Sequence, residues 1–129
     1  MKAALTELFV YGTLQRGCSN HDQLAGQAWL GEARTEELYR LYDLDGYPGM
    51  VVDDVPPGCS IPGEIWAVDA ACLARLDRFE GVGEGLYARI PVELAPPQAG
   101  RLAMTYVYLP SIRGRTELAR WGPAGGEPR

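Results

Sequence analysis

One glutamate of the sequence lies where a helical pattern places it among apolar side chains. The segment from Ala70 to Phe79 predicts a helix, and at about 100° per residue Leu73, Leu76 and Phe79 fall on one apolar side. Glu80, the next residue, falls about 20° from Leu73 and so inside that apolar arc. The spacing therefore indicates a carboxylate that points toward the core.

A carboxyl group in that position is suited to proton transfer. Burial disfavours its ionised form and raises its pKa, and the partial negative charge of a helix C-terminus acts in the same direction. A pKa moved toward neutrality makes a glutamate an effective general acid or base near pH 7. The alternative is that the helix ends before Glu80 and the side chain points to water, because the ends of predicted helices are uncertain by a few residues.

A second candidate feature is the stretch "YGTL", Tyr11 to Leu14, which follows an apolar strand. Gly12 permits either a backbone conformation closed to other residues or the close approach of a ligand to the main chain. Successive N–H groups after such a turn can bind an anion. The lysine of a phosphate-binding loop is missing, so a small carboxylate fits better than a phosphate. An ordinary turn at the end of a strand is the other interpretation.

The elements that would position these residues are strands and short helices. Strands are predicted at 5–11, once or twice within 29–44, after the "GYPG" turn, and at 64–68, 87–94 and 102–109. Asn20 can cap a short helix over about 21–26, Asp69 can cap the helix over 70–79, and Gly81 can end it. This order indicates an α+β fold with a curved mixed sheet. We expect a single domain over 1–112 and a loosely ordered C-terminal tail over 113–129.

Composition argues against several classes of function. The 129 residues carry a formal charge of −5 and no Lys/Arg cluster, which argues against nucleic acid as a partner. No apolar run is long enough to span a membrane, and Glu7 interrupts the N-terminal apolar stretch, so a secretory signal is not expected. Three cysteines without a CxxC pair and a single histidine argue against a disulfide framework and a zinc site. We therefore expect a cytoplasmic protein without a metal.

Two further side chains are candidates for chemistry. Cys18 precedes His21 by three residues, so a thiol–imidazole pair is conceivable, but no third residue that would orient the histidine is evident. A plain loop cysteine is the favoured interpretation. Glu64 begins an alternating strand, and an outward-facing side chain is expected there.

Several short motifs occur in an order that resembles a known family. They are "FVYGTLQRG" followed by "NH", then "YPGMV", "GEIWAVD", "LDRFEG", "YARIPVEL" and "AMTYVYLP", from Leu8 to Pro110. Together they resemble the gamma-glutamylcyclotransferase-like family, and in particular its gamma-glutamylamine cyclotransferase and small bacterial-type branch. The resemblance implies a small curved mixed β-barrel-like sheet flanked by short helices. It also implies an enzyme that converts a gamma-glutamyl compound into 5-oxoproline and a free amine or amino acid.

The resemblance assigns roles to individual residues. The glutamate of the "LDRFEG" motif, Glu80, would be the acid–base residue. Residues implied to hold the substrate are those of the first loop and a tyrosine of a late strand, namely Tyr11, Gly12, Thr13, Leu14 and Tyr106. Tyr87 and Arg89 match a "YxR" pattern, in which Arg89 is expected to be structural.

This chemistry agrees with a glutamate of raised pKa. The substrate's α-amine must lose a proton before it attacks the γ-carbonyl, and such a carboxylate can take that proton and later pass one to the departing nitrogen. No cofactor, metal or covalent nucleophile is required, and the expected partner is a small gamma-glutamyl substrate. The alternative is a non-catalytic module of the same fold that binds a carboxylate metabolite. The sequence leaves the leaving amine and the oligomeric state open.

Overall fold

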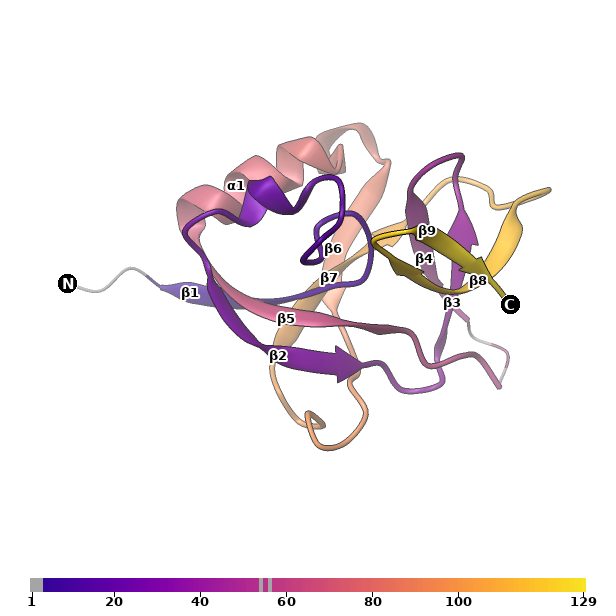
Figure 1. Ribbon diagram of the computed structural model, residues 1–129, viewed down its shortest axis with the longest axis horizontal. Helices are drawn as coiled ribbons and strands as arrows, with labels where there is room; N and C mark the ends of the chain where they lie inside the picture. The colour runs from indigo at the N-terminus through magenta and orange to yellow at the C-terminus, as the bar shows by residue number, and fades with distance from the viewer. Residues whose placement is uncertain (1–3, 54, 56) are drawn as a thin grey trace.

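The chain forms two β-sheets, with helices packed beside the larger one (Figure 1). The computed structural model describes residues 4–53, 55 and 57–129. The strands are β1 Leu5–Val10, β2 Ala28–Arg34, β3 Tyr39–Asp43, β4 Pro48–Val52, β5 Pro62–Asp69, β6 Tyr87–Pro91, β7 Ala103–Tyr108, β8 Thr116–Gly122 and β9 Gly125–Pro128. The helices are α1 Ala70–Phe79 and two short 3-10 helices, η1 His21–Leu24 and η2 Val82–Glu84. The larger sheet has the strand order β2-β5-β1-β7-β6 and the smaller one β4-β3-β8-β9.

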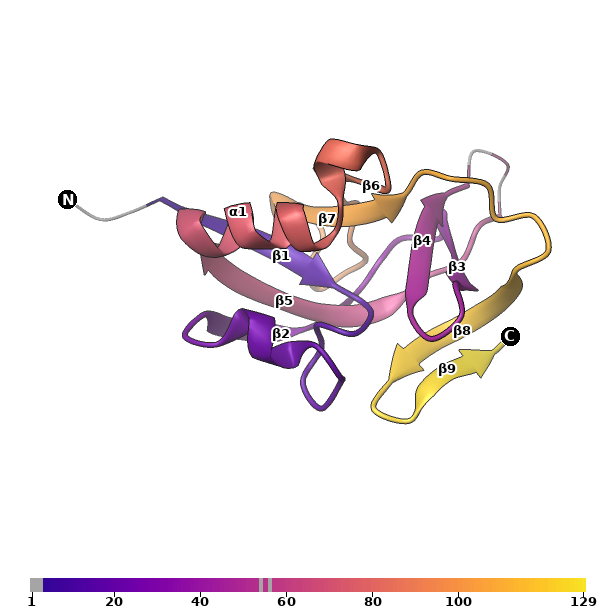
Figure 2. The same ribbon diagram turned by 90° about the horizontal axis from the view of Figure 1, so that it is seen from above.

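The sheet arrangement confirms the α+β class and the mixed strand directions. Strand β1 pairs antiparallel with β5 and parallel with β7. The strands do not close into a barrel within the described part of the chain, because the ladder is divided into two sheets (Figure 2). Strands β4 and β7 pack against each other across that division. Gly49 permits this approach, since a Cβ there would lie 2.9 Å from the Cβ of Tyr108.

Strand β1 lies between two apolar cores, because successive side chains of a strand point to opposite faces. Leu8 and Val10 pack in the core beneath α1. Phe9, and Tyr11 directly after the strand, point into the core between the two sheets. The end of β1, where the "YGTL" loop begins, is therefore anchored on both faces.

The helix predicted over 70–79 has the expected bounds and the expected cap. The side chain of Asp69 accepts a hydrogen bond from the backbone N–H of Cys72 at 2.8 Å. The earlier helix is a shorter 3-10 turn that ends at Leu24, and Asn20 does not cap it with its side chain. Instead, the Asn20 amide donates to the hydroxyl of Thr13 at 3.0 Å, so it braces the first loop.

The prediction of a loosely ordered tail over 113–129 is wrong. Strand β8 pairs with β3, and β9 pairs with β8 in a hairpin. Leu118 and Trp121 of β8 are buried in the core between the sheets. A Cβ at Gly126 would lie 2.8 Å from a methyl group of Leu118, so this glycine allows close packing where its sequence context suggested flexibility.

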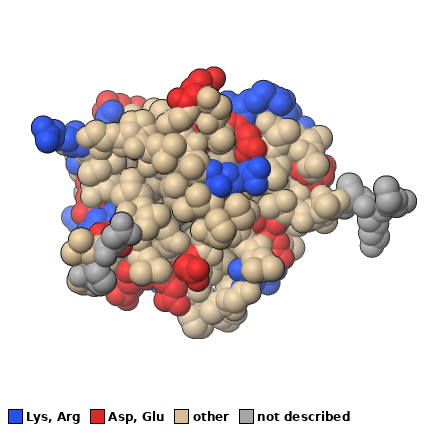
Figure 3. All heavy atoms as spheres, turned by 180° about the vertical axis from the view of Figure 1, so that it is seen from behind, with Lys and Arg blue, Asp and Glu red and all other residues tan. Residues whose placement is uncertain are grey.

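One face of the molecule carries a mixture of charged and uncharged side chains. Charged side chains of both signs are scattered over the face in Figure 3, with uncharged residues between them. Among the described helices, none has the length and apolar character that crossing a membrane requires. Residues 1–3, part of the N-terminal stretch considered above, lie outside the described residues.

Candidate active site

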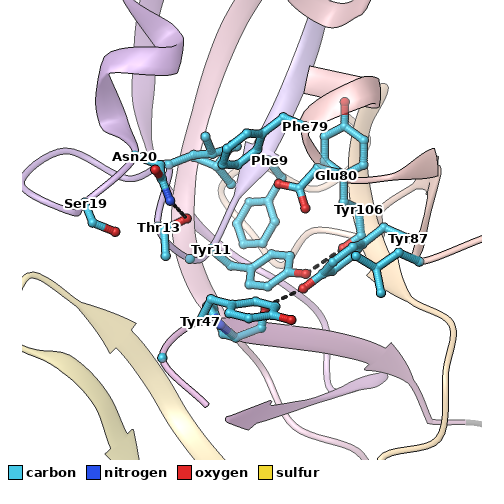
Figure 4. Close-up of a pocket in the computed structure, with 16 residues that line it drawn as sticks. Phe9, Tyr11, Thr13, Ser19, Asn20, Tyr47, Phe79, Glu80, Tyr87 and Tyr106 are labelled. Atoms are coloured by element: carbon cyan, nitrogen blue, oxygen red, sulfur yellow. Dashed lines mark hydrogen bonds between the residues drawn. The ribbon is translucent and has the colours of Figure 1, made fainter. Parts of the chain in front are cut away.

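A cavity of about 320 Å³ opens where the loop after β1, the end of α1 and the start of β4 meet (Figure 4). The residues predicted to form the site all line this cavity, namely Tyr11, Gly12, Thr13, Leu14, Glu80 and Tyr106. They come from three stretches of the chain that the sheet order brings together, since β1 lies beside β7 and α1 packs over both. The structure thus joins the two features that the sequence presents separately.

Glu80 extends its carboxylate into this cavity from the C-terminal cap of α1 (Figure 4). Its backbone N–H donates to the carbonyl of Leu76 at 2.8 Å, so Glu80 keeps the helical direction beyond the last residue of α1. Desolvation raises the pKa of its carboxyl from 4.5 to about 7. The alternative of a side chain pointing to water is therefore wrong for Glu80.

A left-handed turn directly after Glu80 leads the chain away from the cavity. Gly81 has φ +66°, and a Cβ there would lie 2.9 Å from a carboxylate oxygen of Glu84. The Gly81 carbonyl accepts hydrogen bonds from the backbone N–H groups of Glu84 and Leu86, both at 3.1 Å. Because glycine tolerates this conformation, the helix ends with Glu80 still directed inward.

The first loop is held through its carbonyl groups. The carbonyl oxygens of Gly12, Thr13 and Leu14 accept hydrogen bonds from residues later in the chain, at 2.9 to 3.2 Å. The backbone N–H groups of the same three residues take part in none of the hydrogen bonds found among the described residues. The loop that borders the cavity therefore has three main-chain donors without a partner among the described residues.

Gly12 is explained by packing rather than by an unusual backbone angle. A Cβ at Gly12 would lie 2.6 Å from Cγ of Pro48, the first residue of β4. Gly12 is not among the glycines with positive φ, and the group that approaches it closely in the structure is the Pro48 ring, a role that the sequence did not suggest. The contact lets β4 form one wall of the cavity.

Two buried tyrosine hydroxyls hold the walls of the cavity together. Tyr11 donates to the carbonyl of Tyr106 at 2.7 Å and accepts from the backbone N–H of Met50 at 3.1 Å. Tyr87 donates to the carbonyl of Pro48 at 2.9 Å (Figure 4). Burial raises the pKa of both tyrosines, so the hydroxyls stay protonated and act as donors.

The last turn of α1 is tied to the sheet by a carboxylate that the sequence reasoning missed. Asp77 accepts two hydrogen bonds from the Arg89 guanidinium, at 2.9 and 3.1 Å, and one from the Tyr106 hydroxyl at 2.7 Å. The Arg89 guanidinium beside Asp77 lowers the pKa of that carboxyl. Asp77 lies one helical turn before Glu80, and this spacing is the feature of the sequence that could have indicated that Asp77 lies near the site. The Tyr106 hydroxyl thus contacts Asp77, and Arg89 joins β6 to the helix.

The thiol alternative finds no support in the geometry. The His21 ring bonds the Leu14 carbonyl through Nδ1 at 2.9 Å, and among the described hydrogen bonds none joins it to the Cys18 thiol. Burial raises the pKa of the Cys18 thiol, whereas a nucleophilic cysteine needs a lowered one. Neither side chain lines the cavity.

The expectation that Glu64 faces solvent is also wrong. Its side chain is buried and accepts hydrogen bonds from the Trp66 indole and the Arg16 backbone N–H, both at 3.1 Å. These donors replace the water that the carboxylate loses.

Within residues 4–53, 55 and 57–129, no three His, Cys, Asp or Glu side chains gather closely enough to hold a metal ion.

The chain combines an α+β fold with a glycine-containing loop after its first strand and a glutamate at a helix end, and both line one cavity. The family model described as "Gamma-glutamyl cyclotransferase, AIG2-like" matches residues 8–123 of this chain. The chain belongs to this family.

Relatives with the same family description come from bacteria and a plant. The chain is 45% identical to a putative gamma-glutamylcyclotransferase of Vibrio cholerae, over 58% of this chain and 62% of that protein. It is 36% identical to one of Arabidopsis thaliana, over 72% of this chain and 53% of that protein. The chain thus spans less than two thirds of the length of these two relatives.

Another relative and a solved structure match over more of their lengths. A protein of Niallia circulans named "Gamma-L-glutamyl-butirosin B gamma-glutamyl cyclotransferase" is 30% identical over 91% of this chain and 76% of its own. The crystal structure of an AIG2-like protein from Mus musculus superposes with a TM-score of 0.76, at 25% identity, covering 97% of this chain and 95% of that one. This chain is similar to both.

Proposed function

We propose that this protein is a gamma-glutamyl cyclotransferase that releases 5-oxoproline and a free amine or amino acid from a gamma-glutamyl compound. Glu80 is the acid–base residue, and the loop from Tyr11 to Leu14 holds the glutamyl part of the substrate. The observation that carries the proposal is the Glu80 carboxyl, which lines the same cavity as that loop and has its pKa raised to about 7.

A carboxyl of this kind suits both halves of the proposed reaction. The substrate's α-ammonium gives a proton to the Glu80 carboxylate, and the freed amine attacks the γ-carbonyl carbon to form the five-membered ring. The protonated Glu80 then gives a proton to the departing nitrogen as its bond to the γ-carbon breaks. With a pKa of about 7, both forms of the carboxyl are populated at neutral pH, so each transfer costs little.

The first loop supplies the binding side of the proposal. The free N–H groups of Gly12, Thr13 and Leu14 can hold the α-carboxylate of the glutamyl group. The described residues that line the cavity include no Lys, Arg or His, so a carboxylate there would be held by neutral donors, the main-chain N–H groups of the loop among them. Fixing the glutamyl chain with its amine near its own γ-carbonyl gives the advantage of an intramolecular reaction.

The leaving group would lie on the more open side of the cavity. Tyr47 and Phe79 line it there and are 41% and 44% exposed. These aromatic faces suit the apolar or cationic body of an amine better than a second carboxylate. The Niallia circulans relative is named for gamma-L-glutamyl-butirosin B as its substrate, which supports a gamma-glutamyl compound as the substrate here.

The proposed setting is the cytoplasm. Cys18, Cys59 and Cys72 are all free thiols in the structure. Free thiols are the usual state of cysteines in a reducing compartment, which supports this location.

A panel assay tests the proposal. Purified protein is incubated with gamma-glutamyl amines and gamma-glutamyl amino acids, and both 5-oxoproline and the released amine are quantified. We expect at least one compound to give the two products in equal amounts. If compounds bind, as shown by calorimetry, but none gives 5-oxoproline, the alternative of a non-catalytic carboxylate-binding module replaces the enzyme.

A further inference from the structure

A second cleft lies on the other side of the loop that borders the candidate active site. Its volume is about 400 Å³. Gln15, Arg16 and Cys18 contribute to it, whereas the earlier residues of the same loop line the first cavity. We propose that this cleft is a separate binding site for a small molecule that carries a carboxylate or phosphate group.

Three arginines from separate chain segments line the cleft. Arg16 comes from the first loop, Arg34 from the end of β2 and Arg120 from β8. A guanidinium group presents a planar fork of donors that matches the oxygens of a carboxylate or phosphate. Three such groups around one hollow are therefore suited to an oxyanion.

The Arg16 guanidinium is fixed in place by a closed ring of contacts. It lies 3.4 Å from the centre of the Trp29 ring, and Trp29 packs edge-on against Trp66 with 5.7 Å between ring centroids. The Trp66 indole donates to Glu64, which also accepts from the backbone and side-chain nitrogens of Arg16 at 3.1 and 3.4 Å. A cation held in this way loses little side-chain freedom when a ligand binds.

The other two arginines are oriented through one nitrogen each. Arg34 Nε donates to the Ser60 hydroxyl at 2.7 Å, and Arg120 Nε lies 3.6 Å from a Glu127 carboxylate oxygen. Among the hydrogen bonds of the described residues, none uses the terminal Nη groups of Arg34 or Arg120. These groups are available to a ligand.

The charge balance of the cleft also favours an anion. Two carboxylates, Glu32 and Glu64, line it beside the three arginines. Glu64 forms an ion pair with Arg16 at 3.4 Å, so these two charges offset each other, and Arg34 and Arg120 supply the positive charge that faces a ligand. With three arginines and two glutamates, the lining carries one net positive charge on a chain of net charge −5. Proline rings from four positions complete its walls and would contact the uncharged part of a ligand.

The new cleft adjoins the candidate active site through one buried side chain. Gln15 Nε2 donates to the carbonyl of Gly12 at 3.2 Å and to that of Trp121 at 2.8 Å. Gly12 borders the first cavity, and Trp121 lies between two residues that line the cleft. Trp29 and Trp66 belong to the ring of contacts around Arg16, and the Trp121 carbonyl accepts a hydrogen bond from Gln15. All three tryptophans of the chain therefore lie at or near residues that line this cleft.

Tryptophan fluorescence is consequently a direct assay of the proposed site. Inorganic phosphate and acetate are titrated separately at pH 7.5, with sodium chloride used to keep the ionic strength constant. Backbone amide NMR shifts of the segment from Gln15 to Cys18, recorded on the same samples, cover the case in which binding leaves the fluorescence unchanged. The assay does not depend on catalysis, so its outcome is independent of the proposed activity.

Variants at two of the arginines show whether the response comes from this cleft. Arg34→Gln and Arg120→Gln each remove a guanidinium but leave the ring around Arg16 intact. We expect each to weaken binding about tenfold or more, the scale of a charge-assisted hydrogen bond. Arg113→Gln is the matched control, since this exposed arginine lies outside the cleft and the substitution changes the net charge equally.

The outcomes separate the possible ligand classes. A saturable response to phosphate indicates a phosphate-bearing ligand, and one to acetate indicates a carboxylate, provided that Arg113→Gln keeps the affinity of the wild type. The proposal is overturned if neither probe gives a saturable response by either method. It is also overturned if Arg34→Gln and Arg120→Gln bind as tightly as the wild type.

Discussion

Replacing Glu80 by glutamine should change how the stability of the protein depends on pH. The pKa of Glu80 is about 7 in the folded protein, against a reference value of 4.5. The folded state therefore binds more protons than the unfolded state between these two pH values. The stabilisation from the protonated carboxyl is fully present below pH 4.5 and is lost as pH rises through about 7. Glu80→Gln removes this titration.

The size of the effect follows from the two pKa values. One pKa unit corresponds to roughly 1.4 kcal/mol, so the full penalty for ionising Glu80 in the folded state is about 3 kcal/mol at high pH. Between pH 5.5 and 8.5, about 2 kcal/mol of this penalty develops. The lower limit stays above the isoelectric point near 4.8, where the protein would be least soluble.

Urea denaturation at pH 5.5 and 8.5 measures the effect. From pH 5.5 to pH 8.5, we expect ionisation of Glu80 to lower the free energy of unfolding of the wild type by about 2 kcal/mol. Glu80→Gln lacks this contribution, so the difference between the variant and the wild type should shift by that amount in favour of the variant. Glu84→Gln is the matched control, because Glu84 is exposed and lies only four residues further along the chain. If the Glu80→Gln and Glu84→Gln curves run parallel over this range, the reasoning about a desolvated carboxyl is refuted.

Three further predictions concern the first loop and the last turn of α1. Gly12→Ala should lower the free energy of unfolding by about 1–3 kcal/mol, because its Cβ would meet Pro48, and Pro48→Ala should restore much of the loss in the double variant, as measured by urea denaturation. Tyr106→Phe should lower the free energy of unfolding by about 1 kcal/mol and reduce kcat, since it removes a hydrogen bond to Asp77; unchanged thermal and kinetic behaviour would contradict that role. Cys18→Ser should keep 5-oxoproline formation within about twofold, and its complete loss would favour the thiol mechanism.

Local signals in the sequence predict the part of the fold that carries the site. The helix wheel places Glu80 correctly because its cap, Asp69, and its stop, Gly81, fix both ends of the helix. The strand before Gly12 is equally plain, since its β-forming residues alternate between two cores. These features depend on residues close together in the chain.

The remaining features depend on contacts between distant segments. The C-terminal hairpin reads as a loose tail because glycine and proline are abundant in it, and only the pairing of β8 with β3 shows that Leu118 and Trp121 are buried. Glu64 reads as outward-facing because Arg16, which is 48 residues away in the chain, becomes its partner only once the first loop folds back over β5. Asp77 is tied to partners on β6 and β7 that no local pattern indicates.

The rate of 5-oxoproline release by wild type and Glu80→Gln, on a gamma-glutamyl compound that the wild type turns over, tests the central claim most directly. General acid–base catalysis contributes roughly a hundredfold or more to rate, so we predict a loss of that size in Glu80→Gln and none in Glu84→Gln. An equal rate in the wild type and Glu80→Gln would contradict the assignment of Glu80 as the residue that moves the proton.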